Sequence, residues 1–233
     1  METIYLLSGL LCDEAVWQGQ VPELRRQYDV RVASFQGFDS IGAMAAHVLD
    51  TAPERFSLVG HSMGGRVALE VYRRTPQRIK RLALLDTGYE SVAPGEAERR
   101  AVLVNKAIAE GVSAIAETWA RPMIAPCNRE TTDVLARVVK MVGRMSGEIY
   151  AGQTRALLNR PDATAVLGAI TCPTLVLCGA QDAWSPPDRH ERMVALIKGA
   201  TLRVIDDCGH MCTMERPGEV LAALQEWMKS RGQ

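Results

Sequence analysis

The chain has 233 residues, of which 47% are hydrophobic and 23% charged, a balance that excludes an intrinsically disordered chain and fits one globular domain. Its 27 basic and 27 acidic residues give a formal net charge of zero, which argues against a nucleic-acid-binding protein or one that binds anionic membranes. We therefore expect a single domain over residues 1–233 whose partner is a small molecule.

The sequence also gives expectations about location and redox state. The first residues lack the basic opening and apolar run of a signal peptide, and no stretch reaches the ~18 apolar residues of a transmembrane helix, so we expect a cytoplasmic protein. Six scattered cysteines in a chain of this length indicate free thiols rather than a disulfide framework. Cys208 and Cys212 flank His210, but a fourth ligand is missing, and we expect no metal site.

The first part of the chain alternates short apolar runs with amphipathic stretches, which is typical of strands and helices that build a parallel sheet. Asp39 or Ser40 could cap the second helix, and Pro76 ends the third. The predicted strands cover residues 4–7, 30–33, 56–59 and 82–85, and the predicted helices cover residues 17–27, 41–51 and 63–74.

This alternation stops at residue 94, and helical periodicity continues to residue 161. Strands return at 174–177 and 202–205, each followed by a helix, at 189–197 and 218–229. The pattern predicts an α/β core, residues 1–93 and 162–233, with a helical cap inserted at 94–161. Because ligands bind at the carboxyl ends of the strands in open α/β sheets, a cap at those ends would wall a pocket.

One motif lies at a predicted strand-to-helix turn. Gly60-His61-Ser62-Met63-Gly64 matches G-x-S-x-G, in which a sharp turn exposes the serine hydroxyl and the glycines allow close approach of the backbone. The alternative is a glycine-rich loop with an incidental serine. The two common phosphate-binding patterns, G-x-x-x-x-G-K-[ST] and G-x-G-x-x-G, are both absent from this segment.

A nucleophilic serine needs a base and an orienting acid. His210 follows the last predicted strand and Asp182 follows the strand before it, so loops at the same sheet edge would carry both. Asp86, at the end of residues 82–85, is a competitor for the acid. The other histidines, His47, His61 and His190, are expected to pack or to face solvent.

The remaining site residues come from two regions. The backbone N–H groups of Leu10, in the turn after the first strand, and of Met63, directly after the serine, are candidates for an oxyanion hole. Apolar residues of the 94–161 segment are candidates for the pocket wall, although core packing explains most of them equally well. They are Trp119, Met123, Ile124, Met141 and Met145.

Together these features resemble the α/β-hydrolase superfamily, particularly small capped esterases and lactonases such as BioH-type carboxylesterases and 3-oxoadipate enol-lactonases. The resemblance covers nearly the whole chain and rests on four landmarks in order: Leu-Leu-Ser-Gly-Leu-Leu, Gly-His-Ser-Met-Gly-Gly, the 179–186 segment with Asp182, and Gly-His-Met ahead of Glu-Arg-Pro. The order Ser, Asp, His is that of the family. The chain starts at the strand before the oxyanion loop, without the two strands that usually precede it, so about six strands are expected, mostly parallel and flanked by helices.

The resemblance implies a serine hydrolase that cleaves a carboxylic ester, lactone or thioester of a small, partly apolar substrate through an acyl-enzyme on Ser62, without a cofactor. Two other activities use the same three residues: hydrolysis of a C–C bond and acyl transfer. A third alternative is a non-catalytic receptor that keeps the fold. The oligomeric state does not follow from the sequence.

Overall fold

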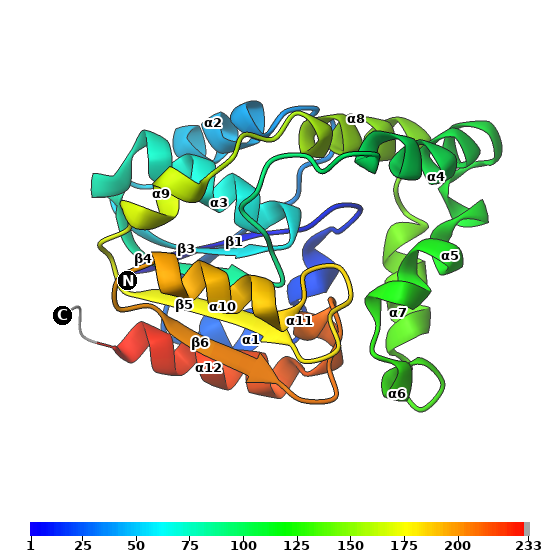
Figure 1. Ribbon diagram of the computed structural model, residues 1–233. Coiled ribbons are helices and arrows are strands. Elements are labelled where there is room, and N and C mark those ends of the chain that lie inside the picture. Colours follow the sequence, from blue (N-terminus) through cyan, green and yellow to red (C-terminus); the bar gives the residue numbers. More distant parts are fainter. Residues whose placement is uncertain (231–233) are drawn as a thin grey trace.

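The computed structural model describes residues 1–230, and its centre is one sheet of six parallel strands in the order β2-β1-β3-β4-β5-β6. The sheet confirms the expected fold class and the expected number of strands (Figure 1). The strands are β1 (Thr3–Leu7), β2 (Asp29–Ala33), β3 (Phe56–His61), β4 (Ile79–Leu85), β5 (Thr174–Gly179) and β6 (Thr201–Ile205).

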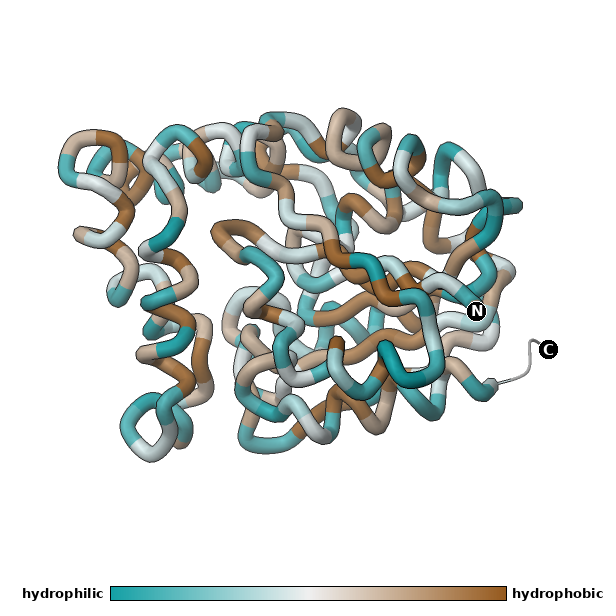
Figure 2. The backbone as a smooth tube through the Cα atoms, turned by 180° about the vertical axis from the view of Figure 1, so that it is seen from behind, coloured by the Kyte–Doolittle hydropathy of each residue, from teal (hydrophilic) through white to brown (hydrophobic). Residues whose placement is uncertain are grey.

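Every residue of β1, β3 and β5 is buried, whereas the edge strands β2 and β6 have exposed positions. Continuous apolar runs form these inner strands because helices cover both faces of a parallel sheet. Figure 2 shows the same arrangement as hydrophobic stretches in the middle of the molecule.

Helices lie on both faces of the sheet. One face is covered by α2, α3, α9 and α10, which pack side by side, and the other face is covered by α12 (Figure 1). The side chain of Gln20, just before α1, donates a hydrogen bond to the backbone oxygen of Pro217 at the start of α12. These helices are α1 (Val21–Leu24), α2 (Ile41–Thr51), α3 (Met63–Arg74), α9 (Thr164–Gly168), α10 (Pro187–Leu196), α11 (Cys212–Glu215) and α12 (Pro217–Lys229).

Between β4 and α9 the chain is helical, and this segment lies beyond the carboxyl ends of the strands (Figure 1). Short 3₁₀ turns connect its helices. Among residues 1–230 no helix combines the length and the apolar character that crossing a bilayer requires. The segment contains α4 (Glu96–Glu110), α5 (Ala116–Ala120), α6 (Pro126–Arg129), α7 (Val134–Val142) and α8 (Gly147–Leu158).

One predicted helix is wrong. Residues 17–27 form the end of a 3₁₀ turn, Glu14–Trp17, and the single turn α1 in place of one continuous helix. Pro22 lies at the start of α1, and Gly19 packs so closely on Pro217 that a side chain there would collide with it. Helical spacing of apolar residues predicted a longer element than these tertiary contacts allow.

Candidate active site

Ser62 lies at the sharp turn between β3, which ends at His61, and α3, which begins at Met63. Its φ of 55° and ψ of −117° are strained for a residue with a side chain, a cost on the order of 1–3 kcal/mol. A hydrogen bond from Ser62 N to Leu85 O, 2.9 Å long, holds the turn against β4. The turn thus fixes the hydroxyl at the carboxyl edge of the sheet.

The glycines of the motif have a steric role. A Cβ on Gly64 would collide with the carbonyl of Leu7 in β1, and a Cβ on Gly60 would collide with the carbonyl of Gly64. Both positions therefore require glycine, because neighbouring backbone occupies the volume of a side chain.

The structure brings the three predicted polar side chains together. His210 Nε2 lies 2.8 Å from Ser62 Oγ, and His210 Nδ1 lies 2.8 Å from Asp182 Oδ2. The other oxygen of Asp182 accepts hydrogen bonds from the backbone N–H groups of Trp184 and Ser185, at 2.8 and 2.9 Å. These bonds fix the carboxylate, and the carboxylate in turn fixes the imidazole with Nε2 toward Ser62.

Charge within this group favours a protonated imidazole. Burial opposes protonation of His210, but the charge and hydrogen bond of Asp182, with smaller contributions from Asp86 and Glu215, outweigh burial and raise the histidine pKa above its ordinary value of 6.5. Burial likewise opposes ionisation of Asp182, but its interaction with His210 and its backbone donors leave its pKa below the ordinary value. The site therefore stabilises the imidazolium that forms when the histidine accepts a proton.

Asp86, the competing acid, is buried elsewhere in the site. One of its oxygens accepts a hydrogen bond of 3.0 Å from Gly179 N, and the other lies 3.7 Å from Nε2 of His61. Burial, reinforced by the charge of Asp182, raises the pKa of Asp86 well above its ordinary value. Burial therefore disfavours ionisation of Asp86, and it is Asp182 that lies within hydrogen-bond distance of the His210 ring.

Leu10 and Met63, the predicted oxyanion-hole residues, both line the cavity next to Ser62. Among residues 1–230, no hydrogen bond from the Leu10 N–H is found, and the Met63 N–H is the first of α3, where helical partners are lacking. Both donors are therefore available to an oxygen atom above Ser62.

A buried residue that the sequence pattern missed holds the turn after β1, which carries Leu10. The side-chain oxygen of Gln153, in α8, accepts a hydrogen bond of 2.8 Å from Leu11 N, and its nitrogen donates to Phe35 O at 3.0 Å. Leu11 itself has a positive φ of 56°. Gln153 thus ties two loops of the sheet edge to the helical segment.

The cavity above Ser62 has a volume of about 690 Å³. Of the predicted wall residues, Trp119 and Met123 line it. Ile124, Met141 and Met145 do not: they are buried in the hydrophobic core, so their prediction as wall residues is wrong. Apolar spacing alone does not distinguish a side chain that faces a cavity from one that packs between helices.

Further residues brace the histidine. His61 Nε2 donates to the backbone oxygen of His210 at 2.8 Å, and His210 N donates to Met123 O at 2.8 Å. The Glu215 carboxylate accepts from Gly209 N and Ala125 N, each at 2.9 Å. Glu215 belongs to the segment after Gly-His-Met, the only sequence signal that could have indicated it.

His190, which was expected only to pack or to face solvent, supports the serine turn through Thr87. Its Nε2 accepts a hydrogen bond from Thr87 N at 3.1 Å, and Thr87 Oγ1 donates to Ser62 O at 2.7 Å. Burial lowers the pKa of His190, which keeps the ring neutral and able to accept.

The chain belongs to the alpha/beta hydrolase family, whose model matches residues 4–224. Among curated relatives, it is 29% identical to a putative carbamate hydrolase of Variovorax paradoxus, over 90% of this chain and 85% of the relative. It is 24% identical to a pimeloyl-[acyl-carrier protein] methyl ester esterase of Nitrosomonas europaea, over 94% of this chain and 92% of that protein.

Solved structures show the same fold. A malate-bound thermophilic esterase from Thermogutta terrifontis superposes with a TM-score of 0.88 and 30% identity, covering 98% of this chain and 90% of that one. An enol-lactonase from Burkholderia xenovorans superposes with a TM-score of 0.87 at 24% identity, over 98% of this chain and 92% of that chain, and its likeness concerns the fold.

Proposed function

We propose that the protein hydrolyses a carboxylic ester or lactone through an acyl-enzyme on Ser62. The observation that carries the proposal is the continuous hydrogen-bonded series Ser62–His210–Asp182 at the wall of a cavity large enough for a small organic molecule. Relatives named as esterases, together with the esterase structure, support the class of bond that is cleaved.

In the proposed mechanism, Ser62 Oγ attacks the acyl carbon while its proton passes to His210 Nε2. The Leu10 and Met63 amides donate hydrogen bonds to the oxyanion, and a donor of this kind typically contributes ~2.7 to 4 kcal/mol to the transition state. His210 then gives the proton to the leaving alcohol. Water attacks the acyl-enzyme with His210 as base, and the carboxylic acid is released with Ser62 regenerated.

Turnover of a neutral short ester, 4-nitrophenyl butyrate, tests this function. We expect the wild-type protein to release nitrophenol catalytically and the Ser62→Ala variant to lose activity by a factor of about 10³ or more, since the attacking oxygen is gone. Circular dichroism of both proteins controls for folding. Equal turnover by the two proteins would refute Ser62 as the nucleophile.

The same assay separates the alternatives. A receptor with this fold would bind the ester without steady release of nitrophenol. An acyltransferase would release nitrophenol faster when an alcohol is added as acceptor, whereas a hydrolase forms the free acid in water alone. A C–C bond hydrolase would cleave a β-diketone in preference to the ester.

A further inference from the structure

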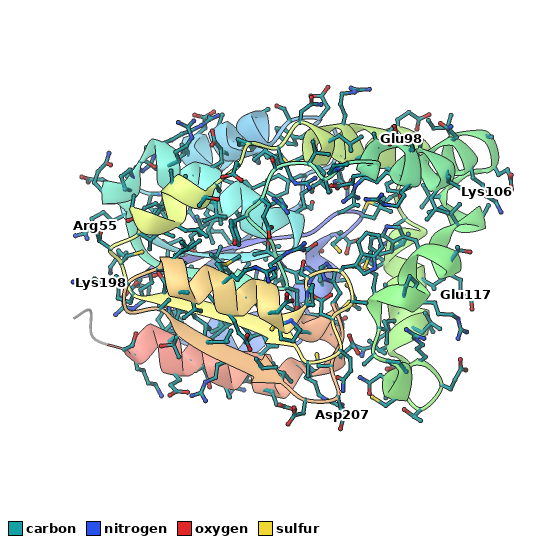
Figure 3. The ribbon with its side chains drawn as sticks, in the orientation of Figure 1. Arg55, Glu98, Lys106, Glu117, Lys198 and Asp207 are labelled. Atoms are coloured by element: carbon teal, nitrogen blue, oxygen red, sulfur yellow. The ribbon has the colours of Figure 1, made fainter. Side chains whose placement is uncertain are left out.

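The charged side chains around the Ser62 cavity are unevenly distributed. Within residues 1–230, three acids line the cavity, Asp86, Glu90 and Glu96, and burial raises the pKa of Asp86 well above its ordinary value. The chain as a whole has no net charge, and labelled acids such as Glu98 and Glu117 lie on the outer surface (Figure 3). Five arginines line the cavity: Arg66, Arg99, Arg100, Arg160 and Arg189.

Arg66 is the arginine of this group nearest in sequence to the serine. It lies on α3 four residues after Ser62, so the two residues share one face of the helix start. Side chains on a helix tilt toward its N-terminus, and that tilt directs Arg66 back toward the serine turn and the cavity it lines.

In the described part of the chain, Arg66, like Arg99, has no acidic partner within ion-pair distance, whereas the other three arginines of the cavity each have one. Arg160 forms two bonds with Glu96, of 2.8 and 2.6 Å, and Arg189 Nε lies 3.3 Å from a carboxylate oxygen of Glu90. Among the ion pairs of residues 1–230 there is none that includes Arg66. Its Nη1 instead donates to the backbone oxygen of Glu90 at 2.8 Å, which uses one of five guanidinium N–H groups.

The environment makes this cation costly to hold. Burial, together with repulsion from Arg160, lowers the pKa of Arg66 to about 9. The guanidinium remains charged at pH 7, and the nearby charges of Glu90 and Glu96 offset burial and repulsion only in part. An anion bound in the cavity would offset that cost, and a carboxylate fits the planar fork of arginine in bidentate fashion.

Arg189 approaches the same point. A Cβ on Gly88 would lie 2.8 Å from Nη2 of Arg66, 3.1 Å from Oε2 of Glu90 and 3.2 Å from Cδ of Arg189, so one carboxylate lies beside the two arginines. The two arginines thus meet over Gly88, directly after the loop residue Thr87 that bonds the serine turn. The positive region is therefore continuous with the reacting centre.

We infer that the substrate cleaved at Ser62 carries, besides its ester or lactone bond, a carboxylate that binds at Arg66 with support from Arg189. This inference rests on the proposed function, since it names the class of substrate for the same site. A bound anion would orient the substrate and would place its scissile carbonyl at Ser62.

Matched esters that differ in one charge test the inference. Mono-4-nitrophenyl adipate is compared with 4-nitrophenyl hexanoate, which has a methyl group in place of the carboxylate, and 4-(butyryloxy)benzoate is compared with 4-(butyryloxy)benzamide. The wild-type protein is expected to prefer the anion in at least one pair by about tenfold or more in kcat/KM, mainly through a lower KM.

In Arg66→Met the preference for the anionic ester should fall to about threefold or less, and Arg66→Lys should keep part of it. Arg192, an exposed arginine of α10, provides the control: Arg192→Met should keep the whole preference. Equal or better turnover of the neutral ester in both pairs by the wild-type protein overturns the inference, whatever the variants do. So does a preference that survives Arg66→Met. If no ester is turned over in a Ser62-dependent manner, the proposed function itself fails.

Discussion

Asp182 and Asp86 show how environment assigns different states to two buried carboxylates at adjacent strand ends. Asp182 has three hydrogen-bond donors, one of them the His210 ring, and ionises readily. Asp86 is buried beside the charge of Asp182 and has one backbone donor, Gly179, so its pKa is raised well above the ordinary value. The carboxylate that bonds the imidazole and contributes most to its raised pKa is Asp182.

This difference predicts the pH dependence of the reaction. His210 acts as a base only when neutral, so kcat/KM should fall as pH drops through a pKa above 6.5. In Asp182→Asn the charge that raises the pKa of His210 is removed while burial remains, so the acidic limb of the profile should move to lower pH. We also expect kcat to fall by about 10⁴, because the imidazole loses its orientation. A pH–rate profile measured with 4-nitrophenyl butyrate gives both values.

Asp86→Asn is the matched control. The amide oxygen can still accept from Gly179 N, and the hydrogen bond between Asp182 and His210 is left intact. We expect activity within about tenfold of wild type and an unshifted acidic limb. A large loss in Asp86→Asn with little change in Asp182→Asn would reverse the assignment of the acid.

At the scale of elements, the turn after β1 is held from outside the sheet. Leu11 has a positive φ, and α8 supplies the acceptor for its N–H through Gln153. The same side chain bonds the loop after β2. The helical segment therefore shapes the site by fixing two core loops in addition to walling the cavity.

Replacing Gln153 by Met tests that role. The substitution keeps the length of the side chain but leaves Leu11 N and Phe35 O without their bonds, so the turn that carries the Leu10 amide should loosen. We expect kcat to fall about tenfold to hundredfold with KM within about threefold, because the oxyanion exists only in the transition state. Arg155→Met, on the exposed side of α8, is the control. A change confined to KM would contradict a positioning role.

Sequence patterns predicted elements well wherever local signals and tertiary packing agree. The helices at 41–51 and 63–74 were predicted with the bounds that the structure shows, because Ser40 caps the first and Pro76 follows the second. The strand at 56–59 was predicted two residues too short, since Gly60 looks like a turn but still pairs with β1 and β4. The prediction of one helix at 17–27 was wrong because Gly19 packs against Pro217, a residue far away in the sequence.

For the whole molecule, the parallel sheet explains why the three central residues could be predicted together. Ser62 and His210 are 148 positions apart, yet each follows the carboxyl end of a strand, and these ends share one edge. Gln153, Glu215 and Arg66 carried no comparable signal. Their roles depend on which groups the helical segment and neighbouring loops bring within bonding distance, and a single sequence does not show this.

The central claim is that one serine, activated by a distant histidine, attacks the substrate. A reactive fluorophosphonate followed by mass spectrometry of peptides tests it most directly, since the reagent stays bonded to an activated serine oxygen. We expect one adduct per chain, on Ser62, with parallel loss of esterase activity and a strongly slowed reaction in His210→Ala. An adduct on another serine, or full activity after Ser62 is modified, would contradict the account.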